Sequence, residues 1–183
     1  MAYNMKDVFY LDTAVDTGTG TGNIASLLDL SSYVDPIARG RSKGTGLAIY
    51  KVHFDICDDD GNSPVAAATT GTFRAALMSL SGIAAGAVGA VSYNSNTLNA
   101  SNDLMIAGVD FYAGGTAAGD PAPNMFLEPS TEVPYVVVRD SVALILDIPT
   151  AMSAGASVKV RIECAQVTLD QSTLNQLLRT QTV

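Results

Sequence analysis

The stretch AVDTGTGTG, residues 14–22, holds the residues nearest to a catalytic motif. Asp16, Thr17 and Gly18 match the Asp-Thr-Gly of aspartic proteases, in which two carboxylates share one proton. The chain has no second Asp-Thr-Gly, so this chemistry would need a homodimer. The alternating glycines also lack the G-x-G-x-x-G spacing of a dinucleotide-binding turn. We therefore expect residues 14–22 to belong to a flexible, glycine-hinged N-terminal arm.

His53 is the only histidine, so a catalytic triad or a histidine-containing metal site would have to use it. Asp55 and Cys57 follow at two-residue intervals on the same face of a predicted strand. Three such side chains spread over about 13 Å, too far to close around one zinc ion. The acidic run 58–61 resembles a calcium loop, but Ala67 stands where that loop needs glutamate. We expect no metal, no cofactor and no enzymatic activity, with His53 solvated or paired across strands.

The charge balance argues against strong nucleic-acid binding. The chain carries 10 Lys and Arg against 18 Asp and Glu, a net charge of −8, which would repel a phosphate backbone. The one basic cluster consists of Arg39, Arg41 and Lys43. A solvated turn explains this cluster best, and a phosphate contact or a contact between subunits is the alternative.

The composition predicts extensive contact with partners. Of the 183 residues, 48% are hydrophobic and only 15% are charged, against about 25% charged in ordinary globular proteins. Residues 75–102 carry no charge and include the closely spaced Gly82, Ala85 and Gly86. A membrane span would be short and built mainly from Ala and Gly, so membrane contact is the weaker interpretation. We expect a strand and a loop packed against another subunit.

Alternating apolar and polar residues predict an all-β fold. In segment 47–57 the residues expected to face the core are Tyr50, Val52, Phe54 and Ile56; in segment 157–167 they are Val158, Val160, Ile162 and Cys164. Segments 104–112, 134–140 and 141–149 are further short apolar runs between turn residues. The turn at 58–64 followed by 72–80 predicts a hairpin with the strand 47–57.

Residues 169–180 form the one helical candidate. Asp170 or Ser172 could cap it, and one stripe holds Leu174, Leu177 and Leu178, which we expect to pack on a neighbouring subunit.

The two cysteines, Cys57 and Cys164, fit neither a zinc spacing nor a disulfide-rich framework. Uninterrupted alternation places them on opposite faces of the sheet, so we expect two free thiols. Lys6 and Asp7 lie where a signal peptide needs its apolar region, so we expect synthesis and folding in the cytosol.

The chain resembles single jelly-roll capsid proteins of small icosahedral viruses, particularly those of tailless phages and archaeal viruses. The resemblance rests on LDLSSYVDPIARGRSKGTGLAIYKVHFDI, an arm leading into a long first strand, and on SVKVRIECAQVTL as the last strand. It implies an antiparallel β-sandwich, a jelly roll of about eight strands. The division of the chain would be an N-terminal arm (1–24), the jelly roll (25–169) and a C-terminal helix or tail (170–183).

The resemblance also implies a function: a structural virion protein that assembles with copies of itself, and with other virion proteins, into an icosahedral shell. Many such proteins carry an Arg-rich arm for the genome, whereas Lys6 is the only cation here before Arg39. The first alternative is a phage tail, baseplate or head-decoration subunit. The second is a dimeric aspartic protease that uses Asp16.

Overall fold

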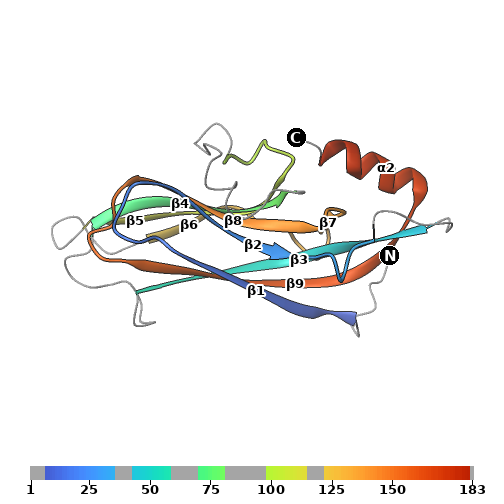
Figure 1. The fold of residues 1–183 in the computed structure, drawn as a ribbon, viewed down its shortest axis with the longest axis horizontal. Coiled ribbons are helices and arrows are strands. Elements are labelled where there is room, and N and C mark those ends of the chain that lie inside the picture. The colour runs from blue at the N-terminus through green and yellow to red at the C-terminus, as the bar shows by residue number, and fades with distance from the viewer. Residues whose placement is uncertain (1–6, 36–42, 59–69, 81–97, 115–121, 182–183) are drawn as a thin grey trace.

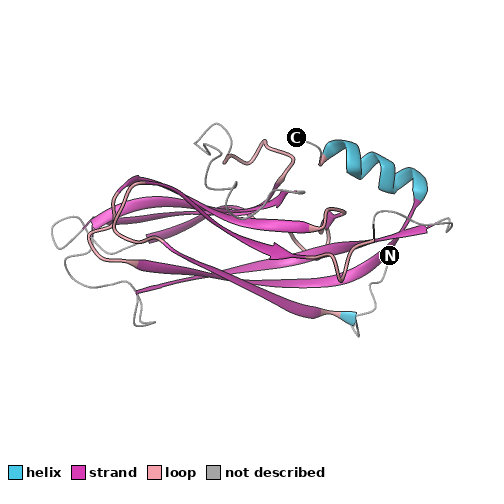
Figure 2. Ribbon diagram, viewed as in Figure 1, coloured by secondary structure: helices cyan, strands magenta, loops and turns pink. Residues whose placement is uncertain are grey.

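The computed structural model describes residues 7–35, 43–58, 70–80, 98–114 and 122–181. Over these residues the chain forms nine strands and one α-helix (Figures 1 and 2). Their bounds are β1 Phe9–Asp16, β2 Gly22–Asp29, β3 Lys43–Asp58, β4 Thr70–Leu80, β5 Met105–Gly114, β6 Ala122–Leu127, β7 Tyr135–Val137, β8 Ser141–Thr150, β9 Ala156–Asp170 and α2 Gln171–Thr180.

The strands build two antiparallel sheets that pack face to face (Figure 1). The first sheet has the order β1-β9-β3-β7 and the second has the order β2-β8-β4-β5-β6. Strands β1 and β3 lie in the first sheet, and β2 and β4 lie in the second, so the chain crosses between the sheets after each of these strands. The same crossing recurs at the end of the chain, where β7 and β9 lie in the first sheet and β8 lies in the second. Without β6, the remaining eight strands form the two four-stranded sheets of a jelly roll, in which each long hairpin wraps around the sandwich. The all-β jelly-roll prediction is confirmed, with β6 as an added edge strand.

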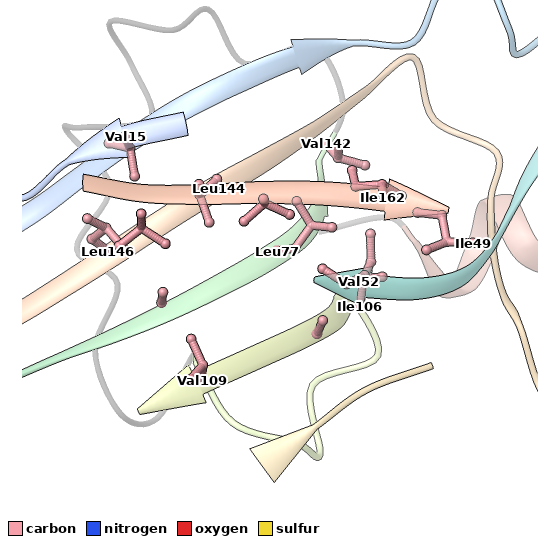
Figure 3. Packing of buried hydrophobic residues seen from close by; sticks show 14 of the residues in the cluster. Val15, Ile49, Val52, Leu77, Ile106, Val109, Val142, Leu144, Leu146 and Ile162 are labelled. Atoms are coloured by element: carbon pink, nitrogen blue, oxygen red, sulfur yellow. The ribbon is translucent and has the colours of Figure 1, made fainter. Parts of the chain in front are cut away.

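The core fills the space between the sheets (Figure 3). Every second residue of β8 and β9 points into it, as strand alternation requires. The side chains of Val142, Leu144 and Leu146 from β8 meet Val158 and Ile162 from β9, all at most 1% exposed. The predicted inward set of β9 is therefore confirmed, with Val160 and Cys164 in the same cluster.

A second apolar cluster lies on the outer side of the second sheet. It contains Ala76, Met78, Ala143 and Ile145 from the strands, and Leu98 covers them with no exposed surface. Because these residues point away from the main core, the strands of this sheet are apolar on both faces.

The prediction of an N-terminal arm over residues 1–24 is wrong from Phe9 onward. Phe9–Asp16 pairs with β9 over eight residues, and Val15 is 8% exposed within the core. The alternation of Phe9, Leu11 and Val15 with polar residues explains the strand. The glycines do form a turn, since Gly18 and Gly22 have φ of 60° and 119°, but the turn joins two strands of the sandwich. The jelly roll therefore begins at Phe9, before the predicted boundary at residue 25.

The segment 47–57 is the third strand, and its predicted hairpin with 72–80 is wrong. β3 pairs with β9 and β7, whereas β4 pairs with β8 and β5 in the other sheet. The inward position of Tyr50 is also wrong. The register of β3 shifts between Ile49 and Lys51, so Tyr50 packs with Ala48 on the outer side while Val52 returns to the core.

The two cysteines are free and buried, as expected. The register adds a reason that alternation alone did not supply. Cys57 lies opposite Ser157, whereas Cys164 lies opposite Ile49. Seven residues of β9 separate the two positions, about 23 Å along the strand, so a disulfide cannot form.

The helix α2 follows β9 directly and lies at one end of the sandwich (Figure 2). Of the two predicted caps, Asp170 and Ser172, the structure has Asp170 as the N-cap: its carboxylate accepts a hydrogen bond from the Thr173 N–H at 2.8 Å, which lowers the pKa of Asp170. At the other end the Gln181 side chain is buried and accepts from the Val138 N–H at 3.2 Å and donates to the Val136 carbonyl at 2.6 Å. Both ends of α2 are thus fixed to the chain's own sheets.

Candidate functional site

The Asp-Thr-Gly tripeptide sits at the end of β1, where it holds β9 in place. The Thr17 side chain is 1% exposed, and its hydroxyl accepts a hydrogen bond from the Ala156 N–H at 3.0 Å. The Thr17 N–H in turn donates to the Ala156 carbonyl at 2.7 Å. Asp16 is exposed at the outer edge of the sheet. The tripeptide therefore has a structural role where β1 meets β9.

His53 forms a cross-strand pair, in line with its expected environment. Its Nε2 lies 2.7 Å from the Glu163 Oε1 on β9. Asp55 follows on the same face, and the Cys57 thiol donates to the Ser157 carbonyl at 3.6 Å. Within the described parts of the chain, no three His, Cys, Asp or Glu side chains gather closely enough to hold a metal ion.

The outer side of the first sheet carries an ordered set of charges, which we call the charged face. It comprises Tyr10 and Asp12 of β1, Glu163, Arg161 and Lys159 of β9, and Lys51, His53 and Asp55 of β3. The register aligns these residues in three rows across the strands. The rows are Tyr10–Glu163–Lys51, Asp12–Arg161–His53 and Ala14–Lys159–Asp55. Opposite charges thus stand next to each other in every row, an arrangement that stabilises antiparallel sheets modestly.

The charged face is hollowed. A concavity of about 850 Å³ opens over β1, β9 and β3. In its middle the Arg161 Nε donates to the Asp12 carboxylate at 3.0 Å, and the guanidinium lies 5.8 Å from the centre of the Tyr10 ring. The hydrogen bond to Asp12 raises the pKa of Arg161. Tyr10 is 59% exposed, so the concavity combines an ordered charge array with accessible aromatic surface.

The second sheet has a polar cluster on its outer side, centred on Arg74. The guanidinium makes two hydrogen bonds with the Asp110 carboxylate, at 2.6 and 2.8 Å, and one with the Leu98 carbonyl at 2.8 Å. It also stacks 4.5 Å from the centre of the Phe126 ring. The paired Asp110 raises the pKa of Arg74. These contacts hold Arg74 in one position, so it fastens β4 to β5 and β6.

A smaller concavity of about 540 Å³ lies beside this cluster. Asp147 lines it, and partial burial raises the pKa of this carboxyl, with the Arg74 charge opposing the effect. Tyr112, 50% exposed, lines it as well.

The residues predicted as contacts between subunits have mixed outcomes. Arg39, Arg41, Gly82, Ala85 and Gly86 lie outside the described residues. Lys43 is exposed at the start of β3, where it remains available to a partner.

The prediction that Leu174 contacts another subunit is wrong, because this side chain is completely buried against the chain's own β3. Its side chain occupies the space above Gly44, where a Cβ would lie 2.8 Å from the Leu174 Cδ2. Leu177 and Leu178 on the same helix are half-buried. Of the three leucines in the stripe, the first therefore packs on the chain itself.

Sequence reasoning missed the charged face and the Arg74 cluster. The alternation of Lys51, His53 and Asp55 and that of Lys159, Arg161 and Glu163 were both visible. Their alignment in rows depends on the register between β3 and β9. The contribution of β1 was hidden because its residues were assigned to the arm.

The strand order and register define the class of protein: an all-β, single jelly-roll domain. Among solved structures, the chain is similar to VP1 of the Trichodysplasia spinulosa-associated polyomavirus in complex with sialylated precision glycooligomers (9% identity, TM-score 0.49), over 92% of this chain and 97% of that one. It is likewise similar to Merkel cell polyomavirus VP1 in complex with disialyllactose (6% identity, TM-score 0.49), over 92% and 98%. The unassembled pentamer of the Merkel cell polyomavirus VP1 matches at 6% identity and a TM-score of 0.46. No protein-family model and no curated protein matches the sequence.

The assignment of the jelly roll rests on the strand order itself. Within the described residues no helix is long and apolar enough to cross a membrane.

Proposed function

We propose that this chain is a structural virion protein, a capsid subunit that assembles with copies of itself into an icosahedral shell. The observation that carries the proposal is the strand order β1-β9-β3-β7 over β2-β8-β4-β5, the jelly roll of which viral capsid proteins are major users. Because one fold serves several functions, the surface chemistry must agree with this role.

The surface chemistry supports assembly over catalysis. Thr17 of the Asp-Thr-Gly tripeptide, and His53, which a histidine-containing metal site would have to use, are engaged in contacts between strands. The sequence has an unusually low share of charged residues, 15%, which favours large contact areas between subunits.

The proposal extends to partners and location. The subunit would be made in the host cytoplasm and incorporated into the virion, where it contacts its own copies and other virion proteins. Its net charge of −8 favours weak binding to nucleic acid, so other components would neutralise the genome.

Electron microscopy of the purified chain, combined with light scattering over a range of protein and salt concentrations, tests the proposal. We expect closed shells of uniform diameter. Rings, tubes or fibres would instead indicate a tail, baseplate or head-decoration subunit. A chain that stays monomeric under all conditions would refute self-assembly.

The protease alternative has a separate test. Cleavage of a peptide library by the wild-type chain, lost in Asp16→Asn, would establish it. We expect no cleavage by either protein.

A further inference from the structure

The charged face of the first sheet differs from the rest of the molecule in its charge balance. It carries three carboxylates (Asp12, Asp55 and Glu163) and three Lys or Arg side chains (Lys51, Lys159 and Arg161), and the exposed Asp16 lies one row further along the same side of β1. Subtracting these from the 18 acidic and 10 basic residues leaves 15 and 7, so the remaining chain holds the entire net charge of −8. The charged face is thus locally neutral on a strongly acidic protein.

Local neutrality decides where two copies can meet. At physiological ionic strength charges are screened beyond about 8 Å, so the groups inside a contact matter more than the net charge of each partner. Two acidic surfaces in contact repel, whereas a surface with alternating signs offers opposite charges to a second copy of itself. The charged face therefore lets two copies approach without net repulsion between the charges inside the contact.

The side chains of this face are already arranged for binding. The pairs Arg161–Asp12 and His53–Glu163, at 3.0 and 2.7 Å, restrict the motion of four otherwise flexible side chains. Restricting side chains before binding lowers the entropy lost on association. The existing pairs also limit the cost of removing water from these charges, because each keeps its partner.

The concavity supplies the anchor that a charged surface alone would lack. Tyr10 exposes 59% of its surface beside Arg161, and tyrosine and arginine are among the residues that contribute most to protein interfaces. The open concavity of about 850 Å³ around them leaves both side chains accessible to a partner.

We propose that the charged face is a contact surface between copies of this chain, with Tyr10 and Arg161 at its centre. This inference rests on the proposed function and names the surface that assembly would use. The occupant is a second copy, because the rows of alternating charge on one copy can complement the same rows on another.

Two pairs of variants test the surface. Glu163→Lys inverts a charge on the charged face, and Glu132→Lys makes the same change on an exposed loop elsewhere. Tyr10→Ala removes the exposed ring, and Tyr112→Ala removes a ring of similar exposure, 50%, from the opposite sheet. Light scattering and sedimentation would measure the protein concentration at which assembly begins, and circular dichroism melts would check folding.

We expect Glu163→Lys and Tyr10→Ala to raise the protein concentration at which assembly begins about tenfold or more. The two control variants should leave this concentration near the wild-type value. If Glu163→Lys fails to fold, Tyr10→Ala decides, since its side chain lies mostly in solvent. If the wild type assembles and Tyr10→Ala assembles at the same concentration, the inference is overturned and the proposed function stays intact. Equal loss in the control variants would also overturn it. A wild-type chain that never assembles would overturn both.

Discussion

The placement of Val15 in the core makes a sharp prediction, because an N-terminal arm and a core strand respond oppositely to the same change. Val15 is 8% exposed between the sheets, and the neighbouring Ala14 points outward. Val15→Asp loses about 1.5–3 kcal/mol of apolar burial and adds several kcal/mol for placing a carboxylate in the core. The sum, about 5 kcal/mol or more, approaches the whole stability of a typical domain, about 5–15 kcal/mol.

Chemical denaturation followed by circular dichroism measures the effect. We expect Val15→Asp, and a chain without residues 1–16, to lose most of the cooperative transition or to be insoluble. Ala14→Asp places the same charge one residue earlier, on the exposed side, and should stay within about 0.5 kcal/mol of the wild type. Equal transition midpoints for Val15→Asp and Ala14→Asp would refute the assignment of β1 to the sandwich.

Three further predictions concern packing, pH and thiol chemistry. A Cβ at Gly108 would clash with the ring of Phe126, so Gly108→Ala should cost about 1–3 kcal/mol in denaturation. A Phe126→Leu background replaces the ring with a smaller side chain and should reduce that cost. Burial raises the pKa of Asp147 above its ordinary value of 3.8, so the folded state takes up a proton more readily and the ionised group costs stability at neutral pH. Asp147→Asn should therefore raise the melting temperature at pH 7, with the gain shrinking as pH falls through the raised pKa toward 3.8; a gain independent of pH would contradict this. Burial raises the pKa of Cys164 to about 12, so this thiol should resist alkylation at pH 8 in the native protein and react only after unfolding, as mass spectrometry of labelled peptides would show.

The pattern of individual strands was predictable because alternation is local. The inward residues Val158, Ile162 and Cys164 follow from a period of two residues, and the cap at Asp170 follows from its side-chain chemistry. The all-β class followed from several such runs separated by turns. These features depend on neighbours in the sequence, so no long-range information was needed.

The failures arose where a local signal competed with another. The glycines of residues 18–22 indicated flexibility and concealed the short alternation of Phe9–Asp16, although the glycines serve only as a turn between two strands. At Tyr50 one extra residue reversed the face of half a strand, which alternation cannot reveal because a bulge depends on the partner strand.

The sequence by itself determined the β class, the amphipathic strands, the helix cap and an acidic, weakly charged chain. Only the tertiary structure decided which strands pair, because β9 inserts between β1 and β3, whose paired residues lie 98 to 155 positions earlier in the chain. That pairing aligns Asp12, Arg161 and His53 in one row and so creates a neutral, hollow face on an acidic protein. Such a surface is a property of register, and register is set by the packing of both sheets around a common core, which no single segment encodes.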